Sequence, residues 1–361
     1  MECEFCTEVS GGEWGQELES RLIGQRYPLG ATFEITERCN LACVHCFINQ
    51  PAANRAARAR ELTLAEIRAI LDQMAEAGCL NLLLTGGDPL LRPDFAEIYR
   101  HAKQKGMLVT LFTNGTLLTP QIADLLAELP PHFLEISLYG HSPETYERVT
   151  QVPGSYARCR RGIELALDRG LRLGLKTIVL TDNCHELPQM RAFAEELGVK
   201  FRYDGMLWPR SDGGQQPWAH RLSPQELVAL DLDDPERQGT WQELDVKLSD
   251  GLVRSELVFH CGAAYHAFHV DAAGRLSACM MARRPSYDLR EMRFQEAWER
   301  LGALRLKKRQ LDTPCRDCTA GIVCIQCPGW SQMAHGDDET PVQFVCEVGR
   351  LRAAKVLSSE R

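Results

Sequence analysis

Residues 31–47 read ATFEITERCNLACVHCF, and this stretch decides how the rest of the chain is interpreted. Residues 31–36 have the composition of a strand, and they lead directly into a loop that holds Cys39, Cys43 and Cys46. The spacing C-x3-C-x2-C places three thiols on one tight loop. A cubane iron–sulfur cluster has four irons, so three cysteines leave one iron without a protein ligand, where a small molecule can bind and be reduced.

A zinc site is the alternative interpretation of this loop. Zinc takes four ligands, and its structural sites usually combine two separated cysteine pairs. The strand before the loop and the helix expected after it do not suggest such a site.

The strand and its cysteine loop resemble the radical S-adenosylmethionine (radical SAM) superfamily. In that family the open iron holds the amino and carboxylate groups of SAM. One electron then cleaves SAM to methionine and a 5′-deoxyadenosyl radical, which abstracts a hydrogen atom from the substrate. The resemblance therefore implies an enzyme in which the cofactor performs the chemistry and the protein orients it. It also implies a [4Fe-4S] cluster and SAM as cofactors, and an external one-electron reductant of the flavodoxin or ferredoxin type.

Other motifs resemble the SAM pocket of that family. The run Gly86-Gly87-Asp88-Pro89 resembles the motif GGEP with Asp in place of Glu, and paired glycines let a backbone approach a ligand closely. The resemblance extends to residues that would contact the adenine, the ribose or the carboxylate of SAM, namely His45, Asn114, Ser137, Arg148 and Lys176. A strand-to-helix turn, a packed imidazole and structural or solvated charges are the alternatives for these positions.

The chain alternates strand-like and helical patterns from residue 31 onward. Strands are expected at 31–37, 80–85, 107–113, 132–138, 173–180 and 199–206. The clearest helix runs from Thr63 to Ala77, where Thr63 and Glu66 form a capping-box pair. Six such units predict an α/β fold with a parallel sheet. The resemblance sharpens this to a six-stranded (β/α)6 partial TIM-like barrel, with its site at the C-terminal ends of the strands.

The C-terminal part of the chain is rich in cysteine. It contains Cys261, Cys279, Cys315, Cys318, Cys324, Cys327 and Cys346. This array resembles the SPASM domain, except that two residues instead of three separate Cys324 from Cys327. The resemblance implies two auxiliary iron–sulfur clusters, expected to be [4Fe-4S]. A structural zinc-ribbon fold is the alternative.

The same resemblance distributes the ligands between the two clusters. Cys315, Cys318, Cys324 and Cys346 would hold one completely, and Cys261, Cys279 and Cys327 would hold the other. Related enzymes often take a fourth thiolate from just upstream of the position of Cys261, but no cysteine occurs between Cys184 and Cys261 here. We therefore expect an open or non-cysteine site on that cluster.

These patterns divide the chain into five expected parts. They are an N-terminal extension (1–30), the barrel (31–207), a linker or bridging region (208–257), the SPASM domain (258–346) and a C-terminal helix (347–361). Cys3 and Cys6 form a lone CxxC pair in the extension, where a mobile tail is the expectation and metal binding the alternative.

Composition limits the partners. The formal net charge of −8 argues against non-specific binding of nucleic acid, which needs a basic face. No signal peptide and no long apolar run occur, so we expect a cytoplasmic protein without a membrane partner. The fifteen cysteines are then better explained as metal ligands than as disulfides.

The combination of these two domains implies hydrogen abstraction from a substrate, often a peptide. Residues 137–156 look most like maturases of ribosomally made peptides, whose products include cross-links, thioethers, epimerised residues and oxidised side chains. About thirty residues precede the first strand, too few for the winged-helix domain that grips a leader peptide in many of them. Recognition is therefore expected from a separate small protein or from the barrel mouth.

Three other functions stay open. They are a sulfatase-type maturase, a small-molecule enzyme acting on a sugar or a tetrapyrrole, and a non-enzymatic iron–sulfur carrier, against which Gly86, Gly87 and Asp88 argue. Tyr139, Tyr203 and Asp204 lie near expected strand ends and are candidates to face the substrate, with packing as the alternative role.

Overall fold

The computed structural model describes residues 20–22, 24–48, 50–234, 237, 256–316 and 318–358. The larger part of the expected N-terminal extension, with Cys3 and Cys6, lies outside the described residues. So do residues 235, 236 and 238–255.

Six parallel strands form the barrel wall, and each matches an expected strand to within a few residues. They are β1 (Gly30–Glu34), β4 (Asn81–Thr85), β5 (Leu108–Thr113), β6 (Phe133–Ser137), β7 (Leu173–Ile178) and β8 (Lys200–Asp204). They pair in chain order through parallel ladders. The expected α/β partial barrel is thereby confirmed.

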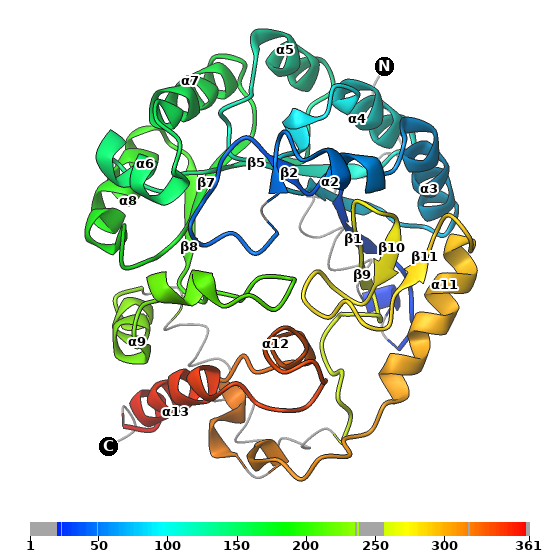
Figure 1. The fold of residues 1–361 in the computed structure, drawn as a ribbon, viewed down its shortest axis with the longest axis vertical. Helices are drawn as coiled ribbons and strands as arrows, with labels where there is room; N and C mark the ends of the chain where they lie inside the picture. Colours follow the sequence, from blue (N-terminus) through cyan, green and yellow to red (C-terminus); the bar gives the residue numbers. More distant parts are fainter. Residues whose placement is uncertain are drawn as a thin grey trace, which may run out of the picture.

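The helices cover the outer face of this wall as a ring (Figure 1). They are α3 (Leu64–Glu76), α4 (Phe95–Gln104), α5 (Pro120–Glu128), α6 (Pro143–Thr150), α7 (Ser155–Asp168) and α8 (Leu187–Glu196). Helix α3 begins with the expected capping box, in which the Thr63 hydroxyl accepts from the Glu66 N–H and the Glu66 carboxylate accepts from the Thr63 N–H at 2.7 Å.

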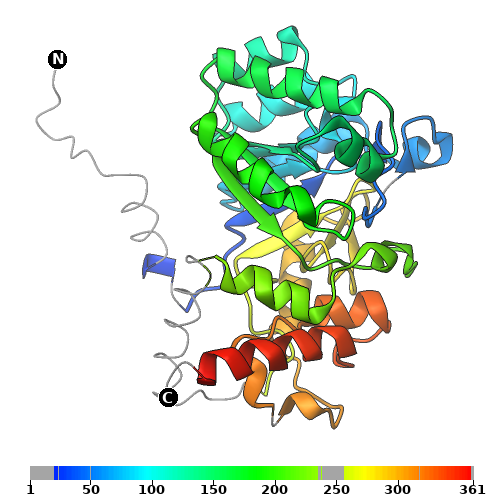
Figure 2. The same ribbon diagram turned by 90° about the vertical axis from the view of Figure 1, so that its left-hand side faces the viewer.

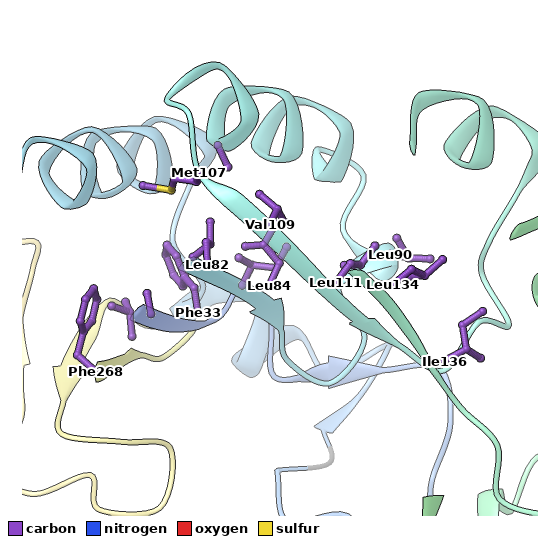
Figure 3. Packing of buried hydrophobic residues seen from close by; sticks show 14 of the residues in the cluster. Phe33, Leu82, Leu84, Leu90, Met107, Val109, Leu111, Leu134, Ile136 and Phe268 are labelled. Carbon is purple, nitrogen blue, oxygen red and sulfur yellow. The ribbon is translucent and has the colours of Figure 1, made fainter. Parts of the chain in front are cut away.

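The hydrophobic core lies between the strands and the helix ring. Figure 3 shows Phe33, Leu82, Leu84, Val109 and Leu111 in this layer, and all five side chains are buried. Successive side chains of a strand point to opposite faces. The neighbours of these residues along each strand, such as Glu34 beside Phe33, therefore face the inside of the barrel.

The sheet continues beyond the six expected strands. Strand β9 (Ala267–Val270) pairs with β1 in parallel, and β10 (Arg275–Ser277) and β11 (Tyr287–Asp288) follow as antiparallel strands. The first part of the cysteine-rich region is thus built onto the edge of the barrel, next to the strand that leads into the cysteine loop.

Helices α9 (Pro224–Leu232), α12 (Pro328–Ala334) and α13 (Gln343–Ser358) lie below the barrel (Figure 2). Helix α11 (Phe294–Leu301) packs on α3 at the side of the helix ring (Figure 1). Helix α13 begins four residues before the expected boundary at 347, so Cys346 belongs to its first turn. It packs along α9, and a buried ion pair joins the two: both the Arg352 Nε and the Arg352 Nη2 reach the Asp231 carboxylate, at 2.8 and 2.6 Å.

No helix in the described ranges is long and apolar enough to span a bilayer.

The ion pair between α9 and α13 makes a testable contribution to stability. Asp231→Asn removes the charge that both Arg352 and Arg237 contact, which we expect to cost about 3 kcal/mol of folding free energy. The exposed pair between Arg300 and Glu296 is the control, and Glu296→Gln is expected to cost under about 1 kcal/mol. Thermal unfolding of the anaerobic protein measures both, and equal shifts of the two midpoints would contradict this account.

Candidate active site

The cysteine loop is fixed by backbone contacts at both ends. Strand β2 (Arg38–Cys39) pairs with β3 (Gln50–Pro51), so the first cysteine belongs to a two-stranded ladder. Farther along, the Ala42 N–H donates to the Thr150 carbonyl at 3.0 Å. Cys39, Cys43 and Cys46 are close enough for their charges to interact, as expected for one shared site.

The two glycines after β4 lie against this loop. A Cβ atom on Gly86 would lie 2.2 Å from the Thr36 carbonyl oxygen, and one on Gly87 would lie 2.3 Å from the Arg38 carbonyl oxygen. The Gly87 N–H donates to the Thr36 carbonyl at 2.8 Å. The close approach expected for this glycine pair is therefore made to the protein's own cysteine loop.

Asp88 joins three neighbouring segments. Its side chain accepts hydrogen bonds from the Leu90 N–H at 2.9 Å, and from the Thr113 hydroxyl and the Asn114 N–H at 2.8 Å each. Burial raises the pKa of Asp88 to about 6, against the opposing effect of these donors. Both carboxylate oxygens accept hydrogen bonds from the protein itself, so Asp88 holds the end of β5 against the segment after β4.

Asn114 contacts the cysteine loop directly. Its side-chain amide donates to the Cys39 sulfur at 3.5 Å and to the Asn40 side chain at 3.0 Å. Its own oxygen accepts from the Thr116 N–H at 2.9 Å. The residue expected to contact SAM is thus one that orients a cluster ligand.

His45 and Tyr139 form an aromatic pair beside the three thiols. Their ring centroids are 4.7 Å apart in an edge-on arrangement. Burial lowers the pKa of His45 to about 4, so the ring is neutral. The Tyr139 hydroxyl interacts with the Ser137 side chain, and its ring lies near the thiols of the loop. Tyr139, His45 and Ser137 therefore share the region expected for the cofactor.

Arg148 and Tyr203 occupy positions that do not match the roles expected for them. Arg148 is exposed and donates to the Thr145 hydroxyl and the Asp182 carbonyl, at 3.1 Å each. Tyr203 donates to the Leu230 carbonyl of α9 at 3.0 Å, on the outer face of the sheet. A substrate inside the barrel would not meet that hydroxyl. Asp204 is exposed on the opposite face, where its carboxylate accepts from the Met206 N–H at 2.8 Å.

The inner face carries two groups of charges that the motifs did not reveal. In the first, the Arg202 Nε donates to the Glu135 carboxylate at 2.6 Å, and the Lys176 ammonium lies 3.5 Å from it. Burial drives the pKa of Lys176 well below its ordinary value, although Glu135 opposes this. Lys176 therefore belongs to a structural ion pair, the alternative noted for it above.

The second group surrounds Glu34, whose side chain is fully buried at the C-terminal end of β1. Its Oε1 atom accepts from Arg283 at 2.7 Å and lies 3.4 Å from the His269 Nε2 atom. Burial alone would raise the pKa of Glu34, but His269 and Arg283 together hold it at about 2. The Oε2 atom is buried without a hydrogen-bond partner among the described residues.

A sequence signal for these groups did exist. Single charged or imidazole side chains interrupt four otherwise uncharged strands, namely Glu34, Glu135, Lys176 and His269, and Arg202 lies on β8, where charged and aromatic residues alternate. Each lies on the face opposite the core, which a strict period-two reading of every strand would have shown.

Two sets of C-terminal cysteines lie close enough for their charges to interact. The charge of Cys327 interacts with Cys279 and Cys261. The charge of Cys346 interacts with Cys315, Cys324 and Cys318, and these four thiols line a cavity of about 130 Å³. Within the described ranges, no three His, Cys, Asp or Glu side chains converge on a site for a single ion.

Polar hydrogens point at the sulfur atoms, as they do around bound clusters. The Gln326 N–H donates to Cys324 at 3.4 Å and the Ala282 N–H to Cys279 at 3.2 Å. A Cβ atom on Gly349 of α13 would lie 3.0 Å from the Cys324 sulfur. The thiol donors, the N–H groups and this close approach all fit iron–sulfur clusters.

A comparison with protein families settles the nature of the N-terminal part. Residues 33–194 match the model described as the radical SAM superfamily. Residues 33–194 are therefore a radical SAM domain. The chain is accordingly an enzyme, and the domain implies a [4Fe-4S] cluster together with SAM.

Curated relatives of this radical SAM enzyme include two kinds of protein. The AdoMet-dependent heme synthase of Methanosarcina barkeri is 27% identical over 84% of this chain and 92% of the relative. The PqqA peptide cyclase of Ruegeria pomeroyi is 33% identical over 48% of this chain and 46% of the relative. The chain thus spans almost all of that heme synthase, but less than half the length of the peptide cyclase and of two further heme synthases.

Solved structures share the fold along nearly the whole chain. Streptococcus suis SuiB bound to its precursor peptide SuiA superposes with a TM-score of 0.70 at 15% identity, covering 96% of this chain and 84% of SuiB. The protein anSMEcpe with bound AdoMet gives 0.63 at 15% identity, covering 92% of this chain and 100% of that one.

The contact between the glycine pair and the cysteine loop can be tested by substitution. Gly87→Ala places a methyl group against the Arg38 carbonyl and should displace the loop, so we expect about four irons fewer per chain. In Gly30→Ala the nearest atom lies 3.8 Å away, and that control should keep its iron. A full iron content in the Gly87 variant would refute the positioning role of this contact.

Proposed function

We propose that this chain is a radical SAM enzyme with a SPASM-type auxiliary domain, and that it modifies the side chain of a ribosomally made peptide. When bound, the cluster and SAM supply a 5′-deoxyadenosyl radical that removes one hydrogen atom from the substrate. The observation that carries the proposal is the gathering of seven C-terminal cysteines into a group of four and a group of three.

The protein's own residues would hold and orient these groups. Cys39, Cys43 and Cys46 would hold the SAM cluster, with the backbone of Gly86 and Gly87 and the side chains of His45, Ser137 and Tyr139 around the cofactor. Cys315, Cys318, Cys324 and Cys346 would hold one auxiliary cluster. Cys261, Cys279 and Cys327 would hold the other and leave one iron open. His260 directly precedes Cys261 and lines the same cavity as Cys327, so it is the non-cysteine candidate for that position.

A peptide substrate is supported by two comparisons. The PqqA peptide cyclase is a relative of the barrel half, and the fold of SuiB with its precursor peptide matches almost the whole chain. Recognition of the peptide by a separate small protein remains part of the proposal. Asp204 stays a candidate to face the substrate, because it lies at the C-terminal end of β8 on the inner side.

A tetrapyrrole is the second candidate substrate. The heme synthase of Methanosarcina barkeri matches along 92% of its length, more completely than the peptide cyclase does. A decarboxylation of a tetrapyrrole side chain would use the same radical chemistry on a propionate. A sulfatase-type protein maturase is a further alternative with no observation of its own in its favour.

Iron analysis tests the two-domain assignment. We expect about twelve irons and as many sulfides per anaerobically reconstituted chain, because each cubane holds four irons. The variant Cys39→Ala/Cys43→Ala/Cys46→Ala should retain about eight. A wild-type content of about four irons per chain would mean that the auxiliary clusters do not form, and it would refute the SPASM assignment.

Substrate assays separate the two candidates. The reduced protein with SAM should form 5′-deoxyadenosine. The true substrate should accelerate the formation of 5′-deoxyadenosine, and one of its hydrogen atoms should appear in that product. Deuterated precursor peptides encoded beside the gene form one arm, and deuterated Fe-coproporphyrin III forms the other. Deuterium transfer from the porphyrin alone would replace the peptide proposal by the tetrapyrrole one.

An external one-electron reductant would reach the SAM cluster at an arginine-rich surface. Cys39, Pro51, Ala53 and Val152 line a hollow of about 370 Å³ on the outside of the cysteine loop. Helix α2 (Arg55–Arg60) begins two residues after Ala53 and exposes three arginines. This local positive charge in a chain of net charge −8 complements an acidic carrier of the flavodoxin or ferredoxin type.

Charge reversal tests this surface. With flavodoxin as the reductant, Arg55→Glu/Arg58→Glu should raise the flavodoxin concentration for half-maximal SAM cleavage by about tenfold at low salt. The difference should shrink at high salt, because screening weakens exposed charges. Arg300→Glu on α11 is the matched control. Equal responses of the two variants would place reductant docking elsewhere.

A further inference from the structure

A second cavity lies between the two cysteine regions. It has a volume of about 450 Å³, and three segments line it: 211–213 after β8, 281–284 after Cys279, and the C-terminal end of α12. The Ser211 N–H donates to the carbonyl of Phe47, the residue that follows Cys46, at 2.8 Å. The cavity therefore borders both the loop of the SAM cluster and the loop of an auxiliary cluster.

Two arginines give this cavity a positive charge. Arg284 is exposed, and its guanidinium is held by the Gly336 carbonyl at 2.9 Å. Among the described residues it has no carboxylate within ion-pair distance. Arg283 lies half-buried at the side toward the barrel, where it donates to the Met280 carbonyl at 2.8 Å and to Glu34 at 2.7 Å.

The described lining contains one acidic residue, Asp212, and its carboxylate is already engaged. It accepts from the Gly214 N–H at 3.0 Å and from the Arg210 Nε at 3.3 Å. The Glu34 carboxylate neutralises the charge of Arg283, and the Asp212 carboxylate neutralises that of Arg210. The positive charge of Arg284 is not neutralised in this way, and a ligand carboxylate would neutralise it.

The rest of the lining includes the polar side chains of Ser211 and Gln332 and an apolar, adaptable part. Met281, Met333 and Ala334 provide the wall next to the arginines. Methionine side chains fill irregular spaces and accommodate different partners. The chemistry that fits is a carboxylate attached to an apolar group, and a guanidinium binds a carboxylate through two parallel hydrogen bonds.

We infer that this cavity binds a carboxylate of the substrate, with Arg284 as its anchor and Arg283 as the wall toward the barrel. The inference rests on the proposed function, because it takes the occupant to be the substrate of the radical reaction. Two sources offer the same chemistry: an acidic side chain of a peptide, and a propionate of a tetrapyrrole. The site holds one end of the substrate between the two cluster loops, so it selects which part of the substrate reaches the barrel.

The test is a binding measurement on the full chain, reconstituted anaerobically with SAM and without a reductant. The first probe is a labelled, end-blocked peptide with glutamates between leucines, compared by fluorescence anisotropy with the same peptide carrying glutamines. The second is coproporphyrin III, compared with its tetramethyl ester. The variants are Arg284→Gln, Met333→Glu, which adds an opposing carboxylate to the cavity, and the control Arg300→Gln.

We expect the carboxylate form of one probe to bind about tenfold more tightly than its neutral form, since a charge-assisted hydrogen bond is worth this factor or more. Arg284→Gln and Met333→Glu should each weaken that binding about tenfold, and Arg300→Gln should not. The responding probe identifies the source. Equal binding by Arg284→Gln and Arg300→Gln, or no preference for the carboxylate in either probe, would overturn the inference.

The failure of the proposed function would look different. It would appear as a reduced wild-type protein that forms no 5′-deoxyadenosine, whereas the binding experiment uses no reductant and measures no turnover. The two results can therefore be judged separately.

Discussion

The site depends on the contact between the glycine pair after β4 and the backbone before Cys39. Gly86 and Gly87 pack on the carbonyls of Thr36 and Arg38 with no room for a Cβ atom, and the Asp88 N–H donates to the Arg38 carbonyl at 3.0 Å. Asp88 then extends the network to the end of β5 through Thr113 and Asn114. Three successive strand ends are locked together in this way. Asn114 also donates to the Cys39 sulfur, so a residue 75 positions farther along the chain helps to position this thiol.

The cysteine-rich region is joined to the same strand from the other side. Strand β9 pairs with β1, and Arg283 crosses to Glu34, five residues before Cys39. The loop after β8 adds a second connection, in which Trp208 stacks on the buried Trp330 with ring centroids 3.6 Å apart. The backbone N–H of Trp330 faces Cys327 and lowers the pKa of its thiol, although burial still raises that pKa to about 11. A displacement of one cysteine region would therefore also shift residues of the other.

The sequence was sufficient for the parts of the molecule that rest on local rules. The six barrel strands and the capping box at Thr63 follow from periodicity and residue spacing, and the family of the cysteine loop follows from the resemblance of its motif to a known superfamily. It was not sufficient where a residue's role depends on what lies across the barrel. Tyr203 lies on the outer face of the sheet, and both carboxylate oxygens of Asp88 accept hydrogen bonds from the protein itself. The register of neighbouring strands decides which way such a side chain points and which residues it contacts. The pairing of β9 with β1 joins segments more than two hundred residues apart, and no local pattern announces it.

The charges inside the barrel follow from the same geometry. Buried ions are costly unless they are paired, and the Glu135 and Glu34 carboxylates are each matched by a guanidinium. The pairing leaves the Glu34 Oε2 atom as a buried acceptor without a donor among the described residues. The Glu34 side chain is fully buried, so its charge depends on Arg283 and His269, both of which belong to the C-terminal region. This group of charges therefore joins the barrel to the C-terminal region in addition to the ladder between β1 and β9.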